Sequence, residues 1–143
     1  MEATYRVIHS LEERHIIGLT ELYRHEWWSN TRTLEQARQL VQSSDLVVGI
    51  CDASDNLVAF ARVLTDWIFR ATVYDVIVAS DHRGQGLGDR VMRELLSNPV
   101  LASVQHIDLH CRPELVAFYE RLGFSSPGAS VRLMRRINTG TLS

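Results

Sequence analysis

Residues 83–88 read Arg-Gly-Gln-Gly-Leu-Gly, a glycine-dense stretch that follows an apolar run from Val73 to Ala79 and precedes a helical pattern from Leu87 to Leu96. These segments predict a strand, a loop and a helix in succession. Glycine lets the loop adopt unusual backbone dihedrals and lets a ligand approach the backbone closely. The start of a helix adds unpaired N–H donors and the positive end of the helix dipole. The stretch therefore predicts a phosphate-binding loop.

The glycine spacing separates this loop from two common phosphate sites. It is not G-x-G-x-x-G, because the third glycine comes one residue early, and no Gly-Lys-Ser/Thr follows. The pattern that matches is Arg/Gln-x-x-Gly-x-Gly, with Arg83, Gly86 and Gly88 in the fixed positions. It resembles the pyrophosphate loop of the GCN5-related N-acetyltransferases (the GNAT family), which hold acetyl-CoA there. The alternative is an ordinary glycine turn between a strand and a helix.

A second motif lies at residues 118–124, which read Phe-Tyr-Glu-Arg-Leu-Gly-Phe. It ends an amphipathic segment that begins at Pro113 and carries apolar residues at helical spacing. Proline suits the first position of a helix, and Gly123 suits its C-terminal cap. The stretch resembles the last helix of GNAT proteins, which commonly ends in Tyr-x-x-x-Gly-Phe. Because both motifs stand in the family's order and at about its separation, the chain is identified as a member by resemblance.

Composition and length bound the class of protein. The chain has 143 residues, 45% hydrophobic and 22% charged, which suits one soluble globular domain over residues 1–143. The net charge is −2 without a long basic run, which argues against nucleic acid as a partner. No apolar stretch approaches the ~20 residues of a membrane span and no signal pattern opens the chain, so a cytoplasmic protein without membrane contact is expected. The cysteines and histidines show no zinc spacing, so reduced thiols and no metal are expected.

The remaining pattern predicts an order of strands and helices. Strands are expected at 5–9, 46–51, 57–64, 68–79 and 106–110, with two more at Phe124 and 131–137. Helices are expected after capping boxes at 10–13 and 33–36, over 87–97 and from Pro113. The resemblance implies an α+β fold, a strongly twisted mixed sheet of about six or seven strands with helices on both faces. It also implies that the fourth and fifth strands, here 69–79 and 106–110, run parallel and then splay apart.

The resemblance places the cofactor acetyl-CoA between those two splayed strands. Its pantetheine arm pairs with the fourth strand like an added strand, which is physically sound because an unpaired edge offers N–H and C=O groups. The implied pantetheine and acetyl contacts are backbone groups of Val76, Ile77 and Val78. The implied pyrophosphate contacts are the amides of Arg83, Gly84, Gln85, Gly86, Leu87 and Gly88. Many members also use an asparagine seven residues before the helix tyrosine, but this chain has Arg112 there, so that contact is not assumed.

Acetyl transfer from a thioester to an amine needs a neutral amine, a stabilised oxyanion and a protonated leaving thiolate. Tyr119 matches the family's tyrosine near the thioester sulfur and is the expected general acid, with a core tyrosine as the alternative. Asp75 is the second expected catalytic residue. It lies inside the run Val-Tyr-Asp-Val-Ile-Val, and burying an unpaired charge in so apolar a segment is costly unless the charge has a function or a partner. It could serve as the base or bind the amine, or it could face a helix dipole or an arginine. Glu26 and Asp66 are further candidates for the base.

Trp27, Trp28 and Asp66 are the expected substrate-binding residues. The two tryptophans lie in the connection that closes over the acceptor in the family, and Asp66 ends the third strand, where the acceptor cleft begins. Either one tryptophan lines a pocket for an apolar or cationic acceptor, or both are packing residues. The hypothesis is an N-acetyltransferase that uses acetyl-CoA and no metal on a small-molecule or peptide amine. The alternative is a non-catalytic acyl-CoA-binding sensor. Homodimers are common in the family, but no feature of this sequence specifies an interface.

Overall fold

The computed structural model describes residues 4–128 and 130–138, which form five strands and four α-helices. The strands are β1 (Arg6–Ile8), β2 (Leu46–Cys51), β3 (Leu57–Thr65), β4 (Arg70–Val78) and β5 (His106–Asp108). The helices are α1 (Glu13–Arg24), α2 (Leu34–Ser43), α3 (Leu87–Leu96) and α4 (Val116–Glu120). Residues up to His110 form one compact unit that holds the sheet and the first three helices, and residues from Cys111 form a second that holds α4.

The five strands form a single mixed sheet in the order β1-β2-β3-β4-β5. The first four pair antiparallel, as expected for short connections, and β5 pairs parallel with β4. The parallel pairing covers only the start of β4, from Arg70 opposite His106 to Thr72 opposite Asp108. Beyond Thr72, β4 continues to Val78 without pairing with β5, and no other strand of the described residues pairs with it on that side. The predicted mixed sheet with parting fourth and fifth strands is therefore confirmed, and the parting leaves an open strand edge.

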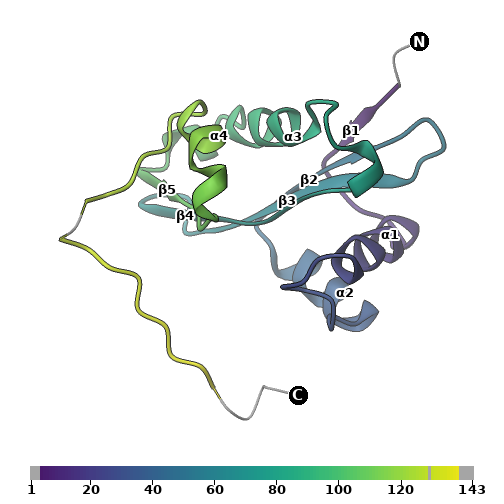
Figure 1. Ribbon diagram of the computed structural model, residues 1–143, viewed down its shortest axis with the longest axis horizontal. Helices are drawn as coiled ribbons and strands as arrows, with labels where there is room; N and C mark the ends of the chain where they lie inside the picture. The colour runs from purple at the N-terminus through teal and green to yellow at the C-terminus, as the bar shows by residue number, and fades with distance from the viewer. Residues whose placement is uncertain (1–3, 129, 139–143) are drawn as a thin grey trace. The chain divides into compact units, whose positions relative to one another are not determined.

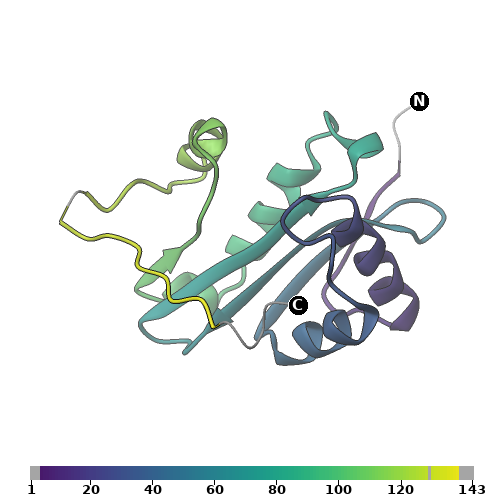
Figure 2. The ribbon, with the colours of Figure 1, turned by 60° about the horizontal axis from the view of Figure 1, so that its bottom comes forward.

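Helices cover both faces of the sheet, as predicted. Figure 1 and Figure 2 show α1 and α2 on one face and α3 on the other. On the first face the core joins Leu19 and Tyr23 of α1 to Phe60 of β3 and Ile77 of β4. On the other face α3 buries four apolar side chains, Leu87, Val91, Met92 and Leu95. Their spacing is that of an amphipathic helix, which explains why the sequence pattern located α3 correctly.

A β-bulge interrupts β4 opposite Ala61. The register with β3 shifts between Phe60, which faces Ile77, and Arg62, which faces Tyr74, so β4 holds one extra residue there. Asp75 lies in the bulge with φ of 58°, the left-handed region that aspartate tolerates better than most residues. A bulge bends a strand and redirects a side chain. The bulge therefore accounts for an acidic side chain inside an otherwise apolar strand.

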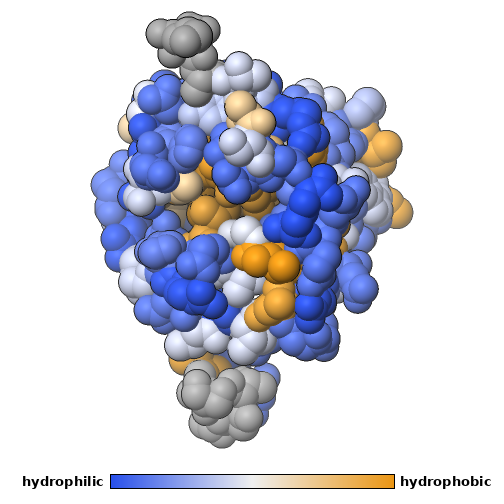
Figure 3. Space-filling view, turned by 90° about the vertical axis from the view of Figure 1, so that its right-hand side faces the viewer, coloured by the Kyte–Doolittle hydropathy of each residue, from blue (hydrophilic) through white to orange (hydrophobic). Residues whose placement is uncertain are grey.

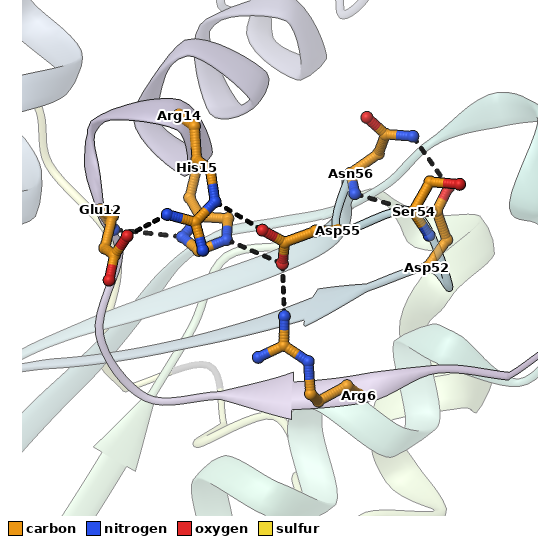
Figure 4. A network of polar contacts seen from close by, with 8 residues as sticks. All are labelled: Arg6, Glu12, Arg14, His15, Asp52, Ser54, Asp55 and Asn56. Atoms are coloured by element: carbon orange, nitrogen blue, oxygen red, sulfur yellow. Dashed lines mark hydrogen bonds and ion pairs between the residues drawn. The ribbon is translucent and has the colours of Figure 1, made fainter.

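The turn between β2 and β3 is tied down by a polar network (Figure 4). Asp55, in the left-handed region with φ of 66°, ion-pairs with Arg6 of β1 and Arg14 of α1, and its carboxylate lies 3.2 Å from His15 Nε2. Within the turn, Asp52 accepts hydrogen bonds from the backbone of Ser54 and Asn56, each at 2.9 Å. In Figure 1 this turn points to the right, and Figure 3 shows the molecule from that side. The surface there is largely hydrophilic, with hydrophobic side chains near its centre. The network fixes the hairpin against α1 on the rim of the sheet.

Two sequence predictions about strands and helix ends are wrong. No strand forms at Phe124 or over 131–137 in the described residues, although Val131, Leu133 and Ile137 alternate, because a strand needs a neighbouring edge and none pairs with this segment. The sheet therefore has five strands instead of six or seven. The first helix starts at Glu13, not from a capping box at 10–13, because the His15 ring accepts from the backbone N–H of Glu12 at 3.1 Å.

Smaller differences concern element lengths. The long fourth strand is two residues shorter at its start than predicted, because residues 66–69 form the turn from β3. The segment from Pro113 opens as a 3-10 turn, Pro113–Leu115, before α4. The second capping box is confirmed, with Thr33 and Gln36 bonding reciprocally at 3.1 and 2.9 Å. Within the described ranges, no helix has the length and apolar character needed to cross a bilayer.

Candidate active site

The loop between β4 and α3 has the geometry of an anion site. A short 3-10 turn, Ser80–His82, follows β4, and Gly84 and Gly86 then adopt φ of 80° and 75°. Gly86 is the N-cap of α3, and among the residues that the structure describes no side chain forms a cap hydrogen bond there. A Cβ added at either glycine would meet no atom of the described residues within 4 Å, so the side of each glycine where a Cβ would lie is open. The predicted strand, loop and helix are confirmed, and the pyrophosphate contacts of residues 83–88 stay a prediction.

The side chain of Arg83 joins this loop to the connection between α1 and α2. Its guanidinium lies 3.0 Å from the Glu26 carboxylate, and its Nε lies 3.4 Å from the carbonyl oxygen of Val78. Glu26 is therefore held in an ion pair beside the loop. The negative charge of Glu26 would repel a phosphate bound at this loop. Glu26 and the phosphate would therefore compete for the Arg83 guanidinium.

Val76, Ile77 and Val78 form the last part of β4, with Val76 in the bulge and the other two after it. Ile77 and Val78 pair with Phe60 and Ala59 of β3. The opposite edge of β4 has no β5 partner there, because the parallel pairing ends at Thr72. This is the edge to which an amide-bearing chain such as pantetheine could add as a strand. The three assigned contacts remain a prediction, and the open edge supports them.

Asp75 is the centre of a cluster at the bulge. Its Oδ2 accepts three hydrogen bonds, each at 2.8 Å, from the Tyr23 hydroxyl, Arg32 Nη1 and Arg62 Nε. Tyr23 belongs to α1, Arg32 to the connection between α1 and α2, and Arg62 to β3, so three separate segments meet on one carboxylate. The expected possibility that Asp75 faces an arginine is therefore correct, and two arginines are present.

The cluster sets the protonation states of Asp75 and Tyr23. Burial raises the pKa of Asp75, but hydrogen bonds from Arg32 and Arg62 and their positive charges outweigh it and leave the pKa below its usual range. Burial and the neighbouring Asp75 charge raise the pKa of Tyr23, which keeps the phenol protonated as a donor. A carboxylate with a lowered pKa is a weak proton acceptor. The geometry favours Asp75 as a group that binds and orients over Asp75 as a base, and its catalytic role stays a prediction.

The two tryptophans differ in their surroundings. Trp27 is 66% exposed, whereas Trp28 is 38% exposed and packs edge-on to Tyr23 with ring centroids 6.2 Å apart. The Arg32 guanidinium lies 4.6 Å from the Tyr23 ring centroid and 5.3 Å from that of Trp28. Cation–π contacts of this kind hold a guanidinium in a fixed orientation. Trp28 therefore packs into the Asp75 cluster, and a role of Trp27 or Trp28 in acceptor binding stays a prediction.

Asp66 is engaged in the turn from β3 to β4. Its Oδ1 accepts from the backbone N–H groups of Ile68, Phe69 and Arg70 at 2.8, 2.8 and 3.1 Å. These hydrogen bonds lower the pKa of Asp66. Aspartate commonly stabilises a turn in this way. The predicted contact of Asp66 with substrate stays a prediction, and the structure gives the residue a turn-capping role.

Tyr119 lies in the second unit, in α4. The residue is buried, and its ring packs edge-on between Phe118 and Phe124, with centroids 4.9 and 6.0 Å away. Burial, with a smaller contribution from Cys111, raises the pKa of Tyr119 to about 12. The phenol therefore carries its proton at neutral pH, as a general acid must. Its role as the acid stays a prediction.

One group of residues has the donor types of a metal site. His15, Cys51 and Asp55 each offer one ligand atom, and these atoms lie within 4.8 Å of one another. Asp55 is already paired with Arg6 and Arg14, however, and His15 Nδ1 accepts from the Glu12 backbone. Two guanidinium charges on the same carboxylate oppose the binding of a cation. This chemistry does not fit a metal ion.

The sequence did not identify Tyr23, Arg32 and Arg62 as members of the site. Tyr23 stands in a helix, and the two arginines stand in unrelated segments. The only signal was an acidic residue in an apolar strand, which requires a partner but does not say which one.

Comparison with known proteins gives consistent matches. Residues 7–124 match the model of the family described as "Acetyltransferase (GNAT) family". A protein of Pyropia yezoensis named as an uncharacterized N-acetyltransferase, ycf52, is 34% identical over 96 residues, which cover 65% of this chain and 55% of that protein. Serotonin N-acetyltransferase 2, chloroplastic, of rice (Oryza sativa subsp. japonica) is 36% identical over 106 residues, which cover 72% of this chain and 53% of that protein. The chain thus spans about half the length of these curated relatives.

Solved structures show the same architecture. A protein of Xanthomonas campestris pv. campestris, whose crystal structure is described as belonging to the GNAT family, superposes with a TM-score of 0.81. The two sequences are 26% identical, and the match covers 96% of each chain.

Proposed function

Because the chain belongs to the acetyltransferase (GNAT) family, we propose that it is an N-acetyltransferase that moves the acetyl group of acetyl-CoA to a primary amine by direct attack. The observation that carries the proposal is the loop between β4 and α3. Gly84 and Gly86 hold left-handed conformations there, no side chain of the described residues caps the start of α3, and the side of each glycine where a Cβ would lie is open. Uncapped amides at the start of a helix bind phosphate without any basic side chain.

The open edge of β4 supplies the second part of the proposal. With the pyrophosphate on residues 83–88, the pantetheine arm runs back along Val78, Ile77 and Val76, where β4 lacks a β5 partner. A backbone N–H of Ile77 or Val78 can then donate to the carbonyl oxygen as negative charge develops on it. Donors fixed before the reaction act in this way in oxyanion holes.

In the proposed reaction, the acceptor ammonium first loses a proton to water. Its nitrogen lone pair then attacks the thioester carbonyl carbon and forms the C–N bond. The C–S bond breaks, and the CoA thiolate takes a proton from the Tyr119 hydroxyl, whose raised pKa keeps it protonated until then. The nitrogen releases its second proton to water, which also returns a proton to the Tyr119 phenolate.

Asp75 acts on the acceptor in this scheme and does not remove its proton. Its Oδ2 is occupied by Tyr23, Arg32 and Arg62, while Oδ1 accepts none of the hydrogen bonds formed among residues 4–128 and 130–138. No fully enclosed side-chain polar atom of the described residues lacks a partner, so Oδ1 is not fully enclosed, although only 6% of the Asp75 side chain is exposed. A carboxylate oxygen in that position can hold an ammonium group close to the acetyl carbon.

Calorimetric titration with acetyl-CoA and CoA, followed by a thiol-release screen over amines, tests the proposal. The panel includes serotonin, because one relative is named for it. We expect micromolar binding of acetyl-CoA and release of CoA with at least one amine. Binding without turnover on any amine would favour a non-catalytic acyl-CoA-binding role, and no binding would refute the assignment of the loop.

A further inference from the structure

The cluster around Asp75 carries more positive than negative charge. The guanidinium groups of Arg32 and Arg62 share one carboxylate, and no other carboxylate in the described part of the chain forms an ion pair with either. The side chains are largely shielded from solvent, with 29% of Arg32, 14% of Arg62 and 6% of Asp75 exposed. A shielded charge without a counterion is costly. The cluster is therefore suited to receive an anion from outside.

Arg32 is the arginine with donors left over. Arg62 is engaged on several sides, by Asp75, by Ser44 Oγ at 3.4 Å and by the Tyr74 ring at 5.1 Å. Arg32 makes one hydrogen bond within the described residues, from Nη1, while Tyr23 and Trp28 hold its guanidinium in place. Its Nε and Nη2 remain as donors in a fixed planar fork, and this is the geometry that binds a carboxylate or a phosphate at two points.

The position of Arg32 indicates which molecule carries the anion. The cofactor in the proposed function runs from residues 83–88 along β4 to Val76, with its phosphates at the loop and its acetyl group near Val76. Asp75 comes directly before Val76, so Arg32 lies beyond the acetyl end of the cofactor. The phosphates of CoA lie at the other end of this path. The anion that reaches Arg32 therefore belongs to the acceptor.

We propose that Arg32 binds an oxyanion of the acceptor, and that the acceptor is an amine with a carboxylate or a phosphate close to its amino group. This inference rests on the proposed function and specifies its substrate class. Asp75 Oδ1 holds the ammonium and Arg32 holds the oxyanion, so the two charges of the acceptor meet opposite charges on adjacent side chains. An amino acid has its two charged groups at this short separation.

Matched pairs of amines test the inference. Each amino acid is compared with the amine that lacks only its carboxylate, such as tryptophan with tryptamine and leucine with isopentylamine, and phosphoethanolamine is compared with ethanolamine. The kcat/KM ratio within each pair is measured for the wild type, Arg32→Gln, Arg32→Lys and the control Arg38→Gln. Arg38 forms exposed ion pairs with Glu13 and Glu35, and within the described residues none of its hydrogen bonds or ion pairs reaches the cluster. Acetyl-CoA affinity and thermal unfolding are measured for every variant.

We expect the wild type to prefer the anionic member of at least one pair, which also tells carboxylate from phosphate. Arg32→Gln should reduce that preference by roughly 10- to 100-fold, the range of charge-assisted hydrogen bonds to an anion, with acetyl-CoA affinity unchanged. Arg32→Lys should fall in between, because it keeps the charge and loses the fork. Arg38→Gln should keep the wild-type ratio.

Two results would overturn the inference while leaving the proposed function intact. In the first, the wild type acetylates amines but never prefers the anionic member of a pair. In the second, Arg32→Gln lowers kcat/KM equally for both members. If no amine is acetylated, the proposed function fails instead. Calorimetry with the CoA-loaded protein then decides the inference, because binding of the amino acids or phosphoethanolamine that is lost in Arg32→Gln supports it and no such binding overturns it.

Discussion

Replacing Asp75 by asparagine should destabilise the protein more than any surface substitution, because it removes the one negative charge from the cluster. Asparagine has the same shape as aspartate and tolerates the left-handed conformation at this position, where φ is 58°. The substitution therefore isolates the charge. Two guanidinium groups, of Arg32 and Arg62, lose their common counterion while they stay largely shielded.

The expected loss follows from this geometry. Removing one member of a buried ion pair costs about 3–5 kcal/mol, and we expect the lower end, about 3 kcal/mol, because the amide oxygen can still accept hydrogen bonds. Asp75→Ala should cost about 1–2 kcal/mol more, since alanine is strained in the left-handed region. Arg32→Gln should cost far less than Asp75→Asn, because it leaves Arg62 and Asp75 as a neutral pair.

The loss should depend on pH in a defined direction. The pKa of Asp75 is lowered in the folded protein, so its contribution is present above the unfolded-state value of about 3.9 and disappears as pH falls through the folded-state value. The difference in unfolding free energy between the wild type and Asp75→Asn should therefore be constant from pH 7 to pH 5 and shrink below about pH 4.

Urea unfolding at pH 7, 5 and 3 measures this difference. With a denaturant slope of about 2 kcal/mol per M, a loss of about 3 kcal/mol moves the midpoint down by about 1.5 M at pH 7. Glu13→Gln is the matched control, because Glu13 is also ion-paired but solvent-exposed, and its midpoint should hardly move. An Asp75→Asn midpoint equal to that of the wild type, or a loss that is the same at pH 3 as at pH 7, would refute the account of the cluster.

Three further predictions concern catalysis and cofactor binding. Tyr119→Phe should lower kcat by at least about 10-fold with little change in acetyl-CoA affinity, and unchanged turnover in a stopped assay would remove the general-acid role. Gly86→Val should weaken acetyl-CoA binding at least about 10-fold in calorimetry, whereas Gly128→Val, at a glycine with φ of 99° and equally open space, should leave it unchanged. Equal loss in both variants would mean that the first effect is not local. Glu26→Gln should strengthen acetyl-CoA binding by about a few-fold, because it releases Arg83 from a carboxylate 3.0 Å away, and the gain should be larger at low salt. Weaker binding would show that the ion pair between Arg83 and Glu26 supports the loop instead.

The strongest parts of the fold could be predicted because they depend on local patterns. The helix over Leu87–Leu96, the hairpin of β2 and β3 and the capping box at Thr33 each follow from residues near in sequence. The glycine loop was also predictable, since glycine adopts the left-handed dihedrals of Gly84 and Gly86 without the strain that a side chain would add. The loop, together with the motif at residues 118–124, was sufficient to identify the family.

The prediction failed where an element depends on a distant partner. Residues 131–137 alternate in polarity like a strand, yet they form none, because a strand exists only with a neighbouring edge. The start of α1 differs from the prediction for a local reason. His15, three residues after the N-cap Glu12, accepts from the Glu12 backbone N–H, a role that glutamate or glutamine usually fills in a capping box.

By itself, the sequence determined that Asp75 needed a partner and that a glycine-rich loop follows β4. Only the tertiary structure decided what that partner is. The bulge in β4, the fold of the connection between α1 and α2 and the pairing of β3 with β4 bring Tyr23, Arg32 and Arg62 onto one oxygen. Electrostatic interactions act through space, so residues 43 and 13 positions apart from Asp75 set its pKa and the excess positive charge beside the site.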